Sequence, residues 1–298
     1  MSSIKSPEKI IPTEEKNITE KRTLYLVGTP IGNLSDITER AKKVLSEVDF
    51  IAAEDTRASG KLLAYYGIKK PLISYFEHNK RERGEIIVNR IIENGESCAL
   101  ITDAGMPAIS DPGEDIVRLC AEKGVTVSVV PGPCAAVSAL AMSGLFTAKF
   151  LFEGFLPTAK GDRREVLAEL RDQTRTIIFY EAPHKLKRTL ADLLEAFGDR
   201  KISLCRELTK INEEVIRTTL SGACAYYEER EPRGEYVLIM EGATKDELKA
   251  HAFWADMSVE EHVEHYLSEG MSKNDAIKAV AHDRDVAKSE IYNQVMIK

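Results

Sequence analysis

The sequence of 298 residues contains few cysteines, and none of them stands in a metal-binding pattern. The five cysteines are scattered and odd in number, and no two form a C-x-x-C pair. A disulfide framework or a zinc site would need paired or clustered cysteines. We therefore expect reduced thiols, no metal site and a cytoplasmic location, because disulfides persist mainly in oxidising compartments.

Long hydrophobic runs and excess positive charge are also missing. No apolar stretch approaches the roughly 20 residues of a membrane-spanning helix, and the charged amino end does not resemble a signal peptide. The net charge of −7 argues against a protein that coats nucleic acid through bulk charge, although it is compatible with a local basic groove. With 43% hydrophobic residues, the chain can bury a core and form about two domains.

Several nucleotide and hydrolase motifs are absent. The chain has no Walker loop, no H-E-x-x-H pair and no serine in a G-x-S-x-G elbow. Gly28, Gly32 and the acids at 54–55 superficially resemble a dinucleotide fingerprint. However, Pro30 stands where the fingerprint needs a glycine, and proline has no amide to offer a pyrophosphate. A nicotinamide-dependent dehydrogenase is therefore disfavoured.

Short apolar segments alternate with helical patterns from residue 23 to about residue 242. This alternation predicts an α/β protein with two α/β domains, a mostly parallel N-terminal sheet and a small C-terminal helical appendage. We expect a flexible tail over 1–22, an N-terminal domain over 23–145 and a C-terminal domain over 146–243. The remaining residues, 244–298, resemble a helix-turn-helix.

Local patterns give more detailed predictions. Asp36 and Glu39 form a plausible capping pair for the first helix, whose apolar positions between Ile37 and Val48 fall on one face. Tyr25, Phe76 and Phe155 are predicted to be core residues rather than platforms that stack on bases.

The sharpest loops follow the predicted strands, above all the Gly-, Pro- and Asp-rich stretch from Thr102 to Gly113. Loops at the carboxyl ends of parallel strands share one rim, where ligands bind. This rim supplies carbonyls, small residues and an acid: Pro30, Asp103, Ala104, Gly105, Met106, Pro133 and Ala135. Such groups suit a nucleoside with a positive centre, because carbonyl dipoles stabilise a cation whereas a phosphate needs amides and lysine.

Six motifs occur in the order seen in the tetrapyrrole methylase superfamily. They are Val27-Gly28-Thr29-Pro30-Ile31-Gly32-Asn33-Leu34, Glu54-Asp55-Thr56-Arg57, Thr102-Asp103-Ala104-Gly105-Met106-Pro107, Pro131-Gly132-Pro133, Tyr180-Glu181-Ala182-Pro183-His184 and Arg206-Glu207-Leu208-Thr209-Lys210. The chain resembles, more narrowly, the branch that methylates small-subunit ribosomal RNA. The resemblance covers about residues 23–242. Thr29-Pro30-Ile31 and Asp103-Ala104-Gly105 depart from the loops usual in the wider superfamily, which weakens a tetrapyrrole substrate.

The resemblance implies an enzyme that binds S-adenosylmethionine between two domains. It would methylate the 2′-hydroxyl of a cytidine in the decoding region of 16S rRNA, either free or in an assembled 30S subunit. Members of the family are usually homodimers.

These expectations give roles to individual residues. Gly234 joins the seven rim residues above as a cofactor-binding candidate. The candidates for the catalytic base are the strand-end carboxylates of Glu54, Asp55 and Glu181, although such carboxylates also serve as caps and ion-pair partners. The candidates for binding RNA are Arg57, His78, Asn79, Arg206 and Lys210.

Two other functions remain open. One is methylation of a tetrapyrrole or another small molecule, which the acidic net charge favours. The other is a nucleic-acid-binding adaptor that acts through the helical tail. The sparse Lys273, Lys278 and Lys288 are compatible with the adaptor, whereas the acids at 260, 261 and 264 oppose it.

Overall fold

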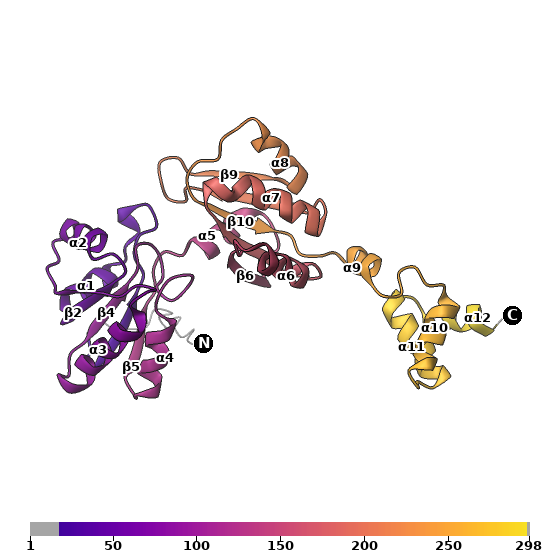
Figure 1. The fold of residues 1–298 in the computed structure, drawn as a ribbon, viewed down its shortest axis with the longest axis horizontal. Helices are drawn as coiled ribbons and strands as arrows, with labels where there is room; N and C mark the ends of the chain where they lie inside the picture. The colour runs from indigo at the N-terminus through magenta and orange to yellow at the C-terminus, as the bar shows by residue number, and fades with distance from the viewer. Residues whose placement is uncertain (1–17, 297–298) are drawn as a thin grey trace, which may run out of the picture. The chain divides into compact units, whose positions relative to one another are not determined.

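A computed structural model of the chain describes residues 18–296 (Figure 1). The first 17 residues of the predicted tail lie outside the described residues. Thr19 and Lys21 at its end contact the body, since their side chains donate hydrogen bonds to Glu47 and Asp49. The fold divides into two compact units. The first contains the residues up to Ser143 together with Leu204–Ile216 and Gly234–Val237, and the second contains the rest.

The first unit is built on a parallel five-stranded sheet in the order β3-β2-β4-β1-β5. Its strands are β1 (Thr23–Val27), β2 (Phe50–Ala53), β3 (Leu72–Ser74), β4 (Cys98–Ile101) and β5 (Thr126–Val130). Its helices are η1 (Leu34–Asp36), α1 (Glu39–Glu47), α2 (Thr56–Tyr65), α3 (Lys80–Glu93), α4 (Glu114–Glu122) and α5 (Ala135–Ser143). The predicted α/β alternation and parallel sheet are confirmed.

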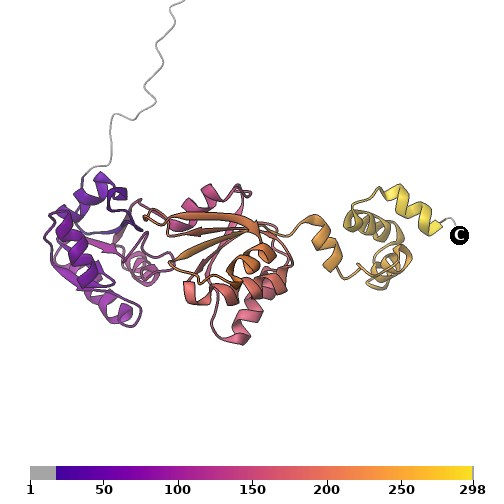
Figure 2. The ribbon, with the colours of Figure 1, turned by 90° about the horizontal axis from the view of Figure 1, so that it is seen from above.

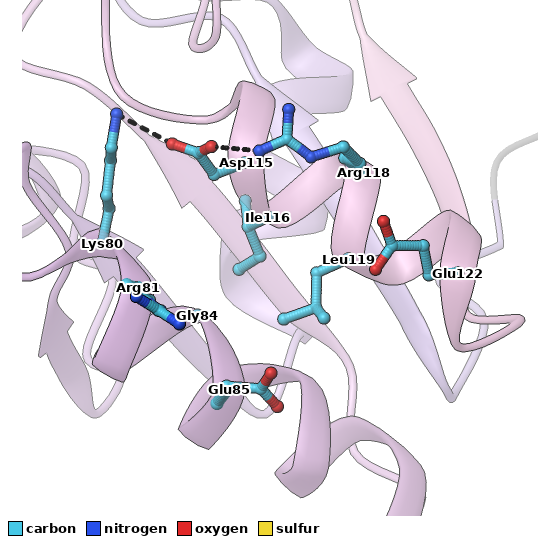
Figure 3. Close-up of a pocket in the computed structure, with 9 residues that line it drawn as sticks. All are labelled: Lys80, Arg81, Gly84, Glu85, Asp115, Ile116, Arg118, Leu119 and Glu122. Atoms are coloured by element: carbon cyan, nitrogen blue, oxygen red, sulfur yellow. Dashed lines mark hydrogen bonds and ion pairs between the residues drawn. The ribbon is translucent and has the colours of Figure 1, made fainter.

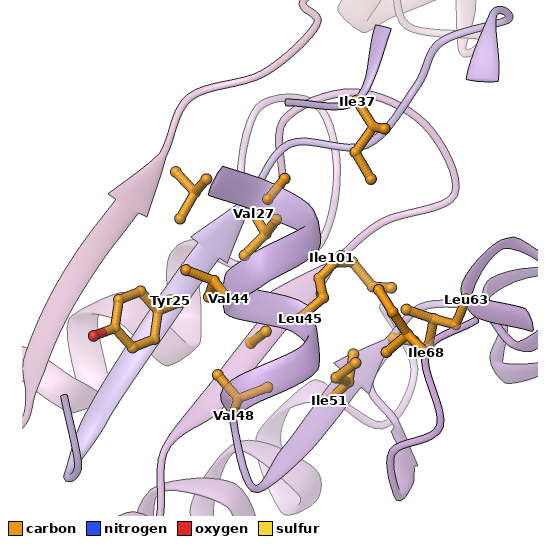
Figure 4. Close-up of a cluster of buried hydrophobic side chains, with 14 residues drawn as sticks. Tyr25, Val27, Ile37, Val44, Leu45, Val48, Ile51, Leu63, Ile68 and Ile101 are labelled. Atoms are coloured by element: carbon orange, nitrogen blue, oxygen red, sulfur yellow. The ribbon is translucent and has the colours of Figure 1, made fainter. Parts of the chain in front are cut away.

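Two hydrophobic cores cover the two faces of this sheet. Successive strand residues point to opposite faces, so Ile51 packs with α1 and α2 (Figure 4), whereas Phe50 packs with α3 and α4. The predicted apolar face of α1 is confirmed by the burial of Ile37, Ala41, Val44, Leu45 and Val48. The predicted capping pair is wrong: Thr38 caps α1 by accepting a hydrogen bond from the amide of Ala41 at 3.0 Å.

The connections of the sheet switch direction at the carboxyl ends of the neighbouring strands β1 and β4. The chain leaves β1 through α1 on one face toward β2, and it leaves β4 through α4 on the other face toward β5. The two loops therefore diverge from neighbouring strands in opposite directions. In open α/β sheets, this switch in strand order is where ligands bind.

The second sheet has the order β6-β7-β10-β8-β9. Its strands are β6 (Phe150–Phe155), β7 (Thr176–Glu181), β8 (Lys201–Arg206), β9 (Glu214–Thr219) and β10 (Tyr236–Met240), and its helices are α6 (Lys160–Leu170), α7 (Pro183–Phe197) and α8 (Leu220–Glu228). The sequence predicts neither β9 nor α8. β9 is an edge strand without buried residues, and α8 contains Gly222, so both lack the clear periodicity of a buried element.

Four helices complete the chain: α9 (Lys245–His251), α10 (Val259–Ser268), α11 (Lys273–Arg284) and α12 (Lys288–Met296). The last three pack against one another around a core of their own, which includes Val263, Ile277 and Ile291 (Figure 1 and Figure 2). As predicted, a turn at Gly270 separates α10 from α11. No helix within residues 18–296 has the length and apolar content needed to cross a bilayer.

Candidate functional site

The loops after β1 and β4 are joined directly to each other. Thr29 and Gly105 exchange two main-chain hydrogen bonds, of 2.9 and 3.1 Å between nitrogen and oxygen. The buried Thr29 hydroxyl also donates to the carbonyl of Thr102 at 3.2 Å. These bonds hold Pro30 and the segment Asp103–Met106 in one rigid group.

The loop after β5 packs onto the same group through glycines. A Cβ atom added to Gly28 would lie 2.7 Å from the Cα of Gly132, so neither position can carry a side chain without movement. A Cβ on Gly105 would lie 3.6 Å from the carbonyl oxygen of Pro133. Three strand-end loops thus meet as predicted, and we call the group formed by Pro30, Asp103–Met106 and Pro133 the cradle.

The cradle residues differ in exposure. Pro30 and Gly105 are buried, Met106 is half-buried, and Asp103 and Ala104 are exposed. Ala135, the first residue of α5, is half-buried beside Pro133 in the chain. The cradle therefore presents a carboxylate and a small side chain, with few other polar groups.

Three carboxylates lie close together beside the cradle. Glu54 lies beside the main-chain amide of Asp103, which favours the charged form of its carboxyl group. Burial and the Asp103 carboxylate raise the pKa of Glu54. Asp111 is also partly buried, and this burial, together with the charges of Glu54 and Asp103, raises its pKa to about 6. The sequence predicts no role for Asp111, because its position depends on how the loop from Thr102 to Gly113 folds back.

The residues of this site fit a ligand that carries a positive charge. The clustered negative charge would be relieved by a positive ligand, as the two raised carboxyl pKa values indicate. Ala104, next to Asp103 in the chain, is exposed and has a small side chain. Within residues 18–296, no group of three or more His, Cys, Asp or Glu side chains is arranged to hold a metal ion.

A second group of loops in the first unit surrounds Lys210. Its ammonium group pairs with Glu207 at 2.8 Å and with Glu235 at 2.7 Å. Gly234 packs against Glu207, and Gly32 packs against the Lys210 side chain; an added Cβ would lie 2.4 Å from a side-chain carbon in each case. Lys210 and Gly234, predicted to bind RNA and cofactor respectively, thus lie in one cluster with the loop after β1.

The other residues predicted to bind RNA have different surroundings. Arg206 pairs with Glu214 at 3.4 Å. Arg57 is exposed and lies 3.4 Å from Asp55, while His78 is exposed beside Phe76. Asn79 accepts a hydrogen bond from the amide of Phe76 and therefore holds the turn before α3. Of this set, the structure leaves Arg57 and His78 most open to solvent.

The two remaining candidates for the base make structural contacts. Asp55 caps α2 by accepting a hydrogen bond from the amide of Arg57 at 2.8 Å. Glu181 is only 4% exposed; it accepts a hydrogen bond from the hydroxyl of Thr189 and one from the amide of Ala182. Among the three candidates, Glu54 alone lies beside Asp103 in the cradle.

The three aromatic residues predicted to lie in the core differ in their exposure to solvent. Tyr25 is buried as predicted, at 1% exposure, and Phe76 is half-buried. The prediction for Phe155 is wrong, since this residue is 55% exposed.

An open pocket of about 320 Å³ lies between α3 and α4 (Figure 3). Lys80 pairs there with Asp115 at 2.8 Å, and Arg118 pairs with the same carboxylate at 2.5 Å. Since these charges neutralise one another, the pocket shows no preference for one kind of ligand.

Comparisons with known proteins place this geometry in a family. The family described as Tetrapyrrole (Corrin/Porphyrin) Methylases matches residues 23–224. Among solved structures, diphthine synthase is similar with a TM-score of 0.58 at 13% identity, covering 74% of this chain and 90% of that one. The cobalamin biosynthetic enzyme cobalt precorrin-4 methyltransferase is similar with a TM-score of 0.55 at 18% identity, covering 74% and 95%. These two likenesses establish the fold.

Similar sequences give a narrower assignment. A protein of Halalkalibacterium halodurans named Ribosomal RNA small subunit methyltransferase I is 49% identical over 274 residues, covering 92% of this chain and 94% of the relative. Proteins with the same name from Bacillus subtilis and Thermotoga maritima are 46% and 48% identical, covering 92% and 74% of this chain and 94% and 98% of the relatives. The chain therefore belongs to the tetrapyrrole methylase family, and within it to the group of the ribosomal RNA small subunit methyltransferases I.

Proposed function

We propose that the protein uses S-adenosylmethionine to methylate the 2′-hydroxyl of a cytidine in the decoding region of 16S rRNA. The observation that carries this proposal is the 49% identity, over almost the whole of both chains, to a protein named for methylation of small-subunit ribosomal RNA. The ribose hydroxyl and the cytidine come from the family resemblance of the motifs.

The cradle would hold the cofactor. Pro30, Asp103–Met106, Pro133, Ala135 and Gly234 are the residues proposed to bind it. S-adenosylmethionine would supply a methyl group activated by a positive sulfur. The carboxylates of Asp103 and Glu54 favour such a cation.

Glu54 would serve as the base in the reaction. A ribose hydroxyl is a weak nucleophile at neutral pH, so a positioned base that holds its proton assists the transfer. The raised pKa of Glu54 makes it a better proton acceptor than an ordinary carboxylate. Asp55 and Glu181 were also candidates, but each is engaged in the contacts described above.

The RNA would be held by a small number of basic and polar groups. We propose that Arg57, His78, Asn79, Arg206 and Lys210 contact it, with Arg57 and His78 the most accessible. We propose that the substrate is rRNA alone or the 30S subunit and that the enzyme works in the cytoplasm. We propose a homodimer, and the edge strand β5 with its exposed Val129 is a surface that a second copy can cover.

Methyl transfer to rRNA tests the proposal. The purified protein is incubated with a radiolabelled methyl donor and either 16S rRNA or 30S subunits from a strain that lacks the gene. We expect label on one cytidine and protection of the adjacent phosphodiester from alkali, because a 2′-O-methyl group blocks this cleavage. Label on a tetrapyrrole acceptor and none on rRNA would refute the proposal.

A further inference from the structure

Strand β6 contains an irregularity that changes where its last residues point. Phe152 pairs with Ile178 of β7, but the next pairs are Gly154 with Phe179 and Phe155 with Tyr180, so Glu153 is an extra residue. Gly154 has φ of +76°, which few other residues adopt readily. Bulges of this kind redirect side chains, often beside functional sites.

The bulge brings together rings that a regular strand would separate. Residues three apart in a strand point to opposite faces, yet Phe152 and Phe155 both contact Tyr180. The centroid distances to the Tyr180 ring are 5.0 Å for Phe152 and 5.6 Å for Phe155, both in edge-to-face geometry. Phe155 is thus held in place at the carboxyl end of the strand while 55% of its surface stays exposed.

The segment after Phe155 is held just as firmly. Arg163 is 5% exposed and donates hydrogen bonds to the carbonyl of Pro157 at 3.3 Å, to Thr189 at 2.8 Å and to Asp192 at 2.6 Å. Thr189 in turn donates to Glu181 at the end of β7. This network fixes the start of α6 relative to the ends of β6 and β7.

Two basic residues lie in the first turns of α6, whose start this network fixes. Lys160 and Arg164 are four residues apart on α6 and therefore share one side of the helix. Both are exposed, and neither side chain forms an ion pair with any residue in the described part of the chain. An exposed ring and two unpaired cations on one rigid segment match the two features of unpaired RNA, its base faces and its phosphates.

We propose that Phe155 stacks on an unpaired base of the RNA substrate and that Lys160 and Arg164 contact the adjoining phosphates. This inference rests on the proposed function, which supplies the kind of substrate. It adds an RNA-positioning site in the second unit, made of residues outside the six sequence motifs. The other partner that could cover the exposed Phe155 ring is a second copy of the chain. The unpaired cations favour RNA, because an apolar contact between protein copies would leave them without partners.

Fluorescence of an RNA probe tests stacking directly. The probe is a single-stranded oligonucleotide from the 16S decoding region with 2-aminopurine placed at each position in turn, since stacking quenches this base. We expect the full-length protein to quench it and Phe155→Ala to lose the quenching and bind roughly 10- to 100-fold more weakly. Phe155→Trp should restore both, whereas Phe155→Leu should not. Phe146→Ala, a change at a 64% exposed phenylalanine outside the ring cluster, is the matched control and should behave like the wild type.

Methyl transfer to 30S subunits completes the test, and sedimentation of wild type and Phe155→Ala shows whether the substitution changes the oligomeric state. On 30S subunits, Phe155→Ala should raise KM with little change in kcat, while affinity for S-adenosylmethionine and thermal stability stay unchanged. Lys160→Gln and Arg164→Gln should each reduce the salt dependence of RNA binding.

The inference would be overturned if Phe155→Leu bound RNA as well as wild type, or if Phe155→Ala changed the sedimenting species. If wild type methylates rRNA and all variants match it, the inference fails while the proposed function stands. If wild type labels no rRNA, the proposed function fails, and the quenching assay still decides whether Phe155 stacks.

Discussion

Thr29 and Gly105 exchange both of their main-chain hydrogen bonds, at 2.9 and 3.1 Å, and so join the loops of two neighbouring parallel strands. The contact between the two loops is made by main-chain atoms, and Asp103, two residues before Gly105, is exposed. The cradle therefore owes its shape to the backbone rather than to large side chains.

Gly28→Ala should disturb this cradle. The new Cβ would lie 2.7 Å from both the Cα of Gly132 and the sulfur of Met106, and overpacking of this kind costs about 1–3 kcal/mol. We expect a lower free energy of unfolding in urea and weaker binding of S-adenosylmethionine. Gly60→Ala is the control: its Cβ would meet only Leu72, at 3.7 Å, within a helix where alanine is favoured. If the two variants were equally stable, the loops after β1 and β5 could move apart without loss of stability, which would contradict the prediction.

The sequence could predict this part of the molecule because its signals are local. Apolar runs marked the strands, and the Gly- and Pro-rich turns marked the loops that meet at their carboxyl ends. Asp111 carried no such signal. Its approach to Glu54 requires a loop in which Ala108 and Ser110 adopt left-handed backbone angles, with φ of 69° and 59°. No residue type in this stretch predicts that conformation.

Asp111→Asn should make the protein more stable at neutral pH. The pKa of this carboxyl is raised to about 6 in the folded state, so the folded protein binds a proton more tightly than the unfolded chain. Stability from this group is therefore present at low pH and lost as the pH rises from about 4 to about 6.

The substitution removes that loss and should raise the free energy of unfolding on the order of 1 kcal/mol at pH 8, after allowing for solvent screening. The difference should vanish near pH 3. Urea unfolding curves across this range measure it, and a gain independent of pH would argue that Asp111 is not destabilised by its acidic neighbours.

Glu181→Ala should act through stability. The carboxylate is buried and bonded to Thr189, which also accepts a hydrogen bond from Arg163. Removing it leaves buried donors without a partner, and we expect a loss of about 1–3 kcal/mol in the free energy of unfolding. Affinity for S-adenosylmethionine at 10 °C should be retained. Glu195→Ala, at an exposed position on α7, is the control. A variant that folds as stably as wild type but no longer transfers methyl groups would return Glu181 to the set of candidate bases.

Phe155 shows a second limit of sequence-based prediction. In a regular strand its alternation with Phe152 would place the two rings on opposite faces, and an aromatic residue in an apolar run reads as core. The extra residue at Glu153 reverses this alternation, and the pairing with β7 that reveals it lies between segments far apart in the chain. The edge strand β9 is not predicted from the sequence for a related reason: it is a strand because it pairs with β8, and its composition does not reveal this pairing.

Isothermal titration calorimetry of S-adenosylmethionine with Asp103→Ala tests the cradle most directly. Asp103 is the exposed carboxylate of the cradle, and loss of a charged hydrogen-bonding group should weaken binding roughly 10- to 100-fold or more. Asp162→Ala, at an exposed aspartate on α6, should bind like wild type. Unchanged affinity in Asp103→Ala would contradict the claim that the loops after β1, β4 and β5 form the cofactor site.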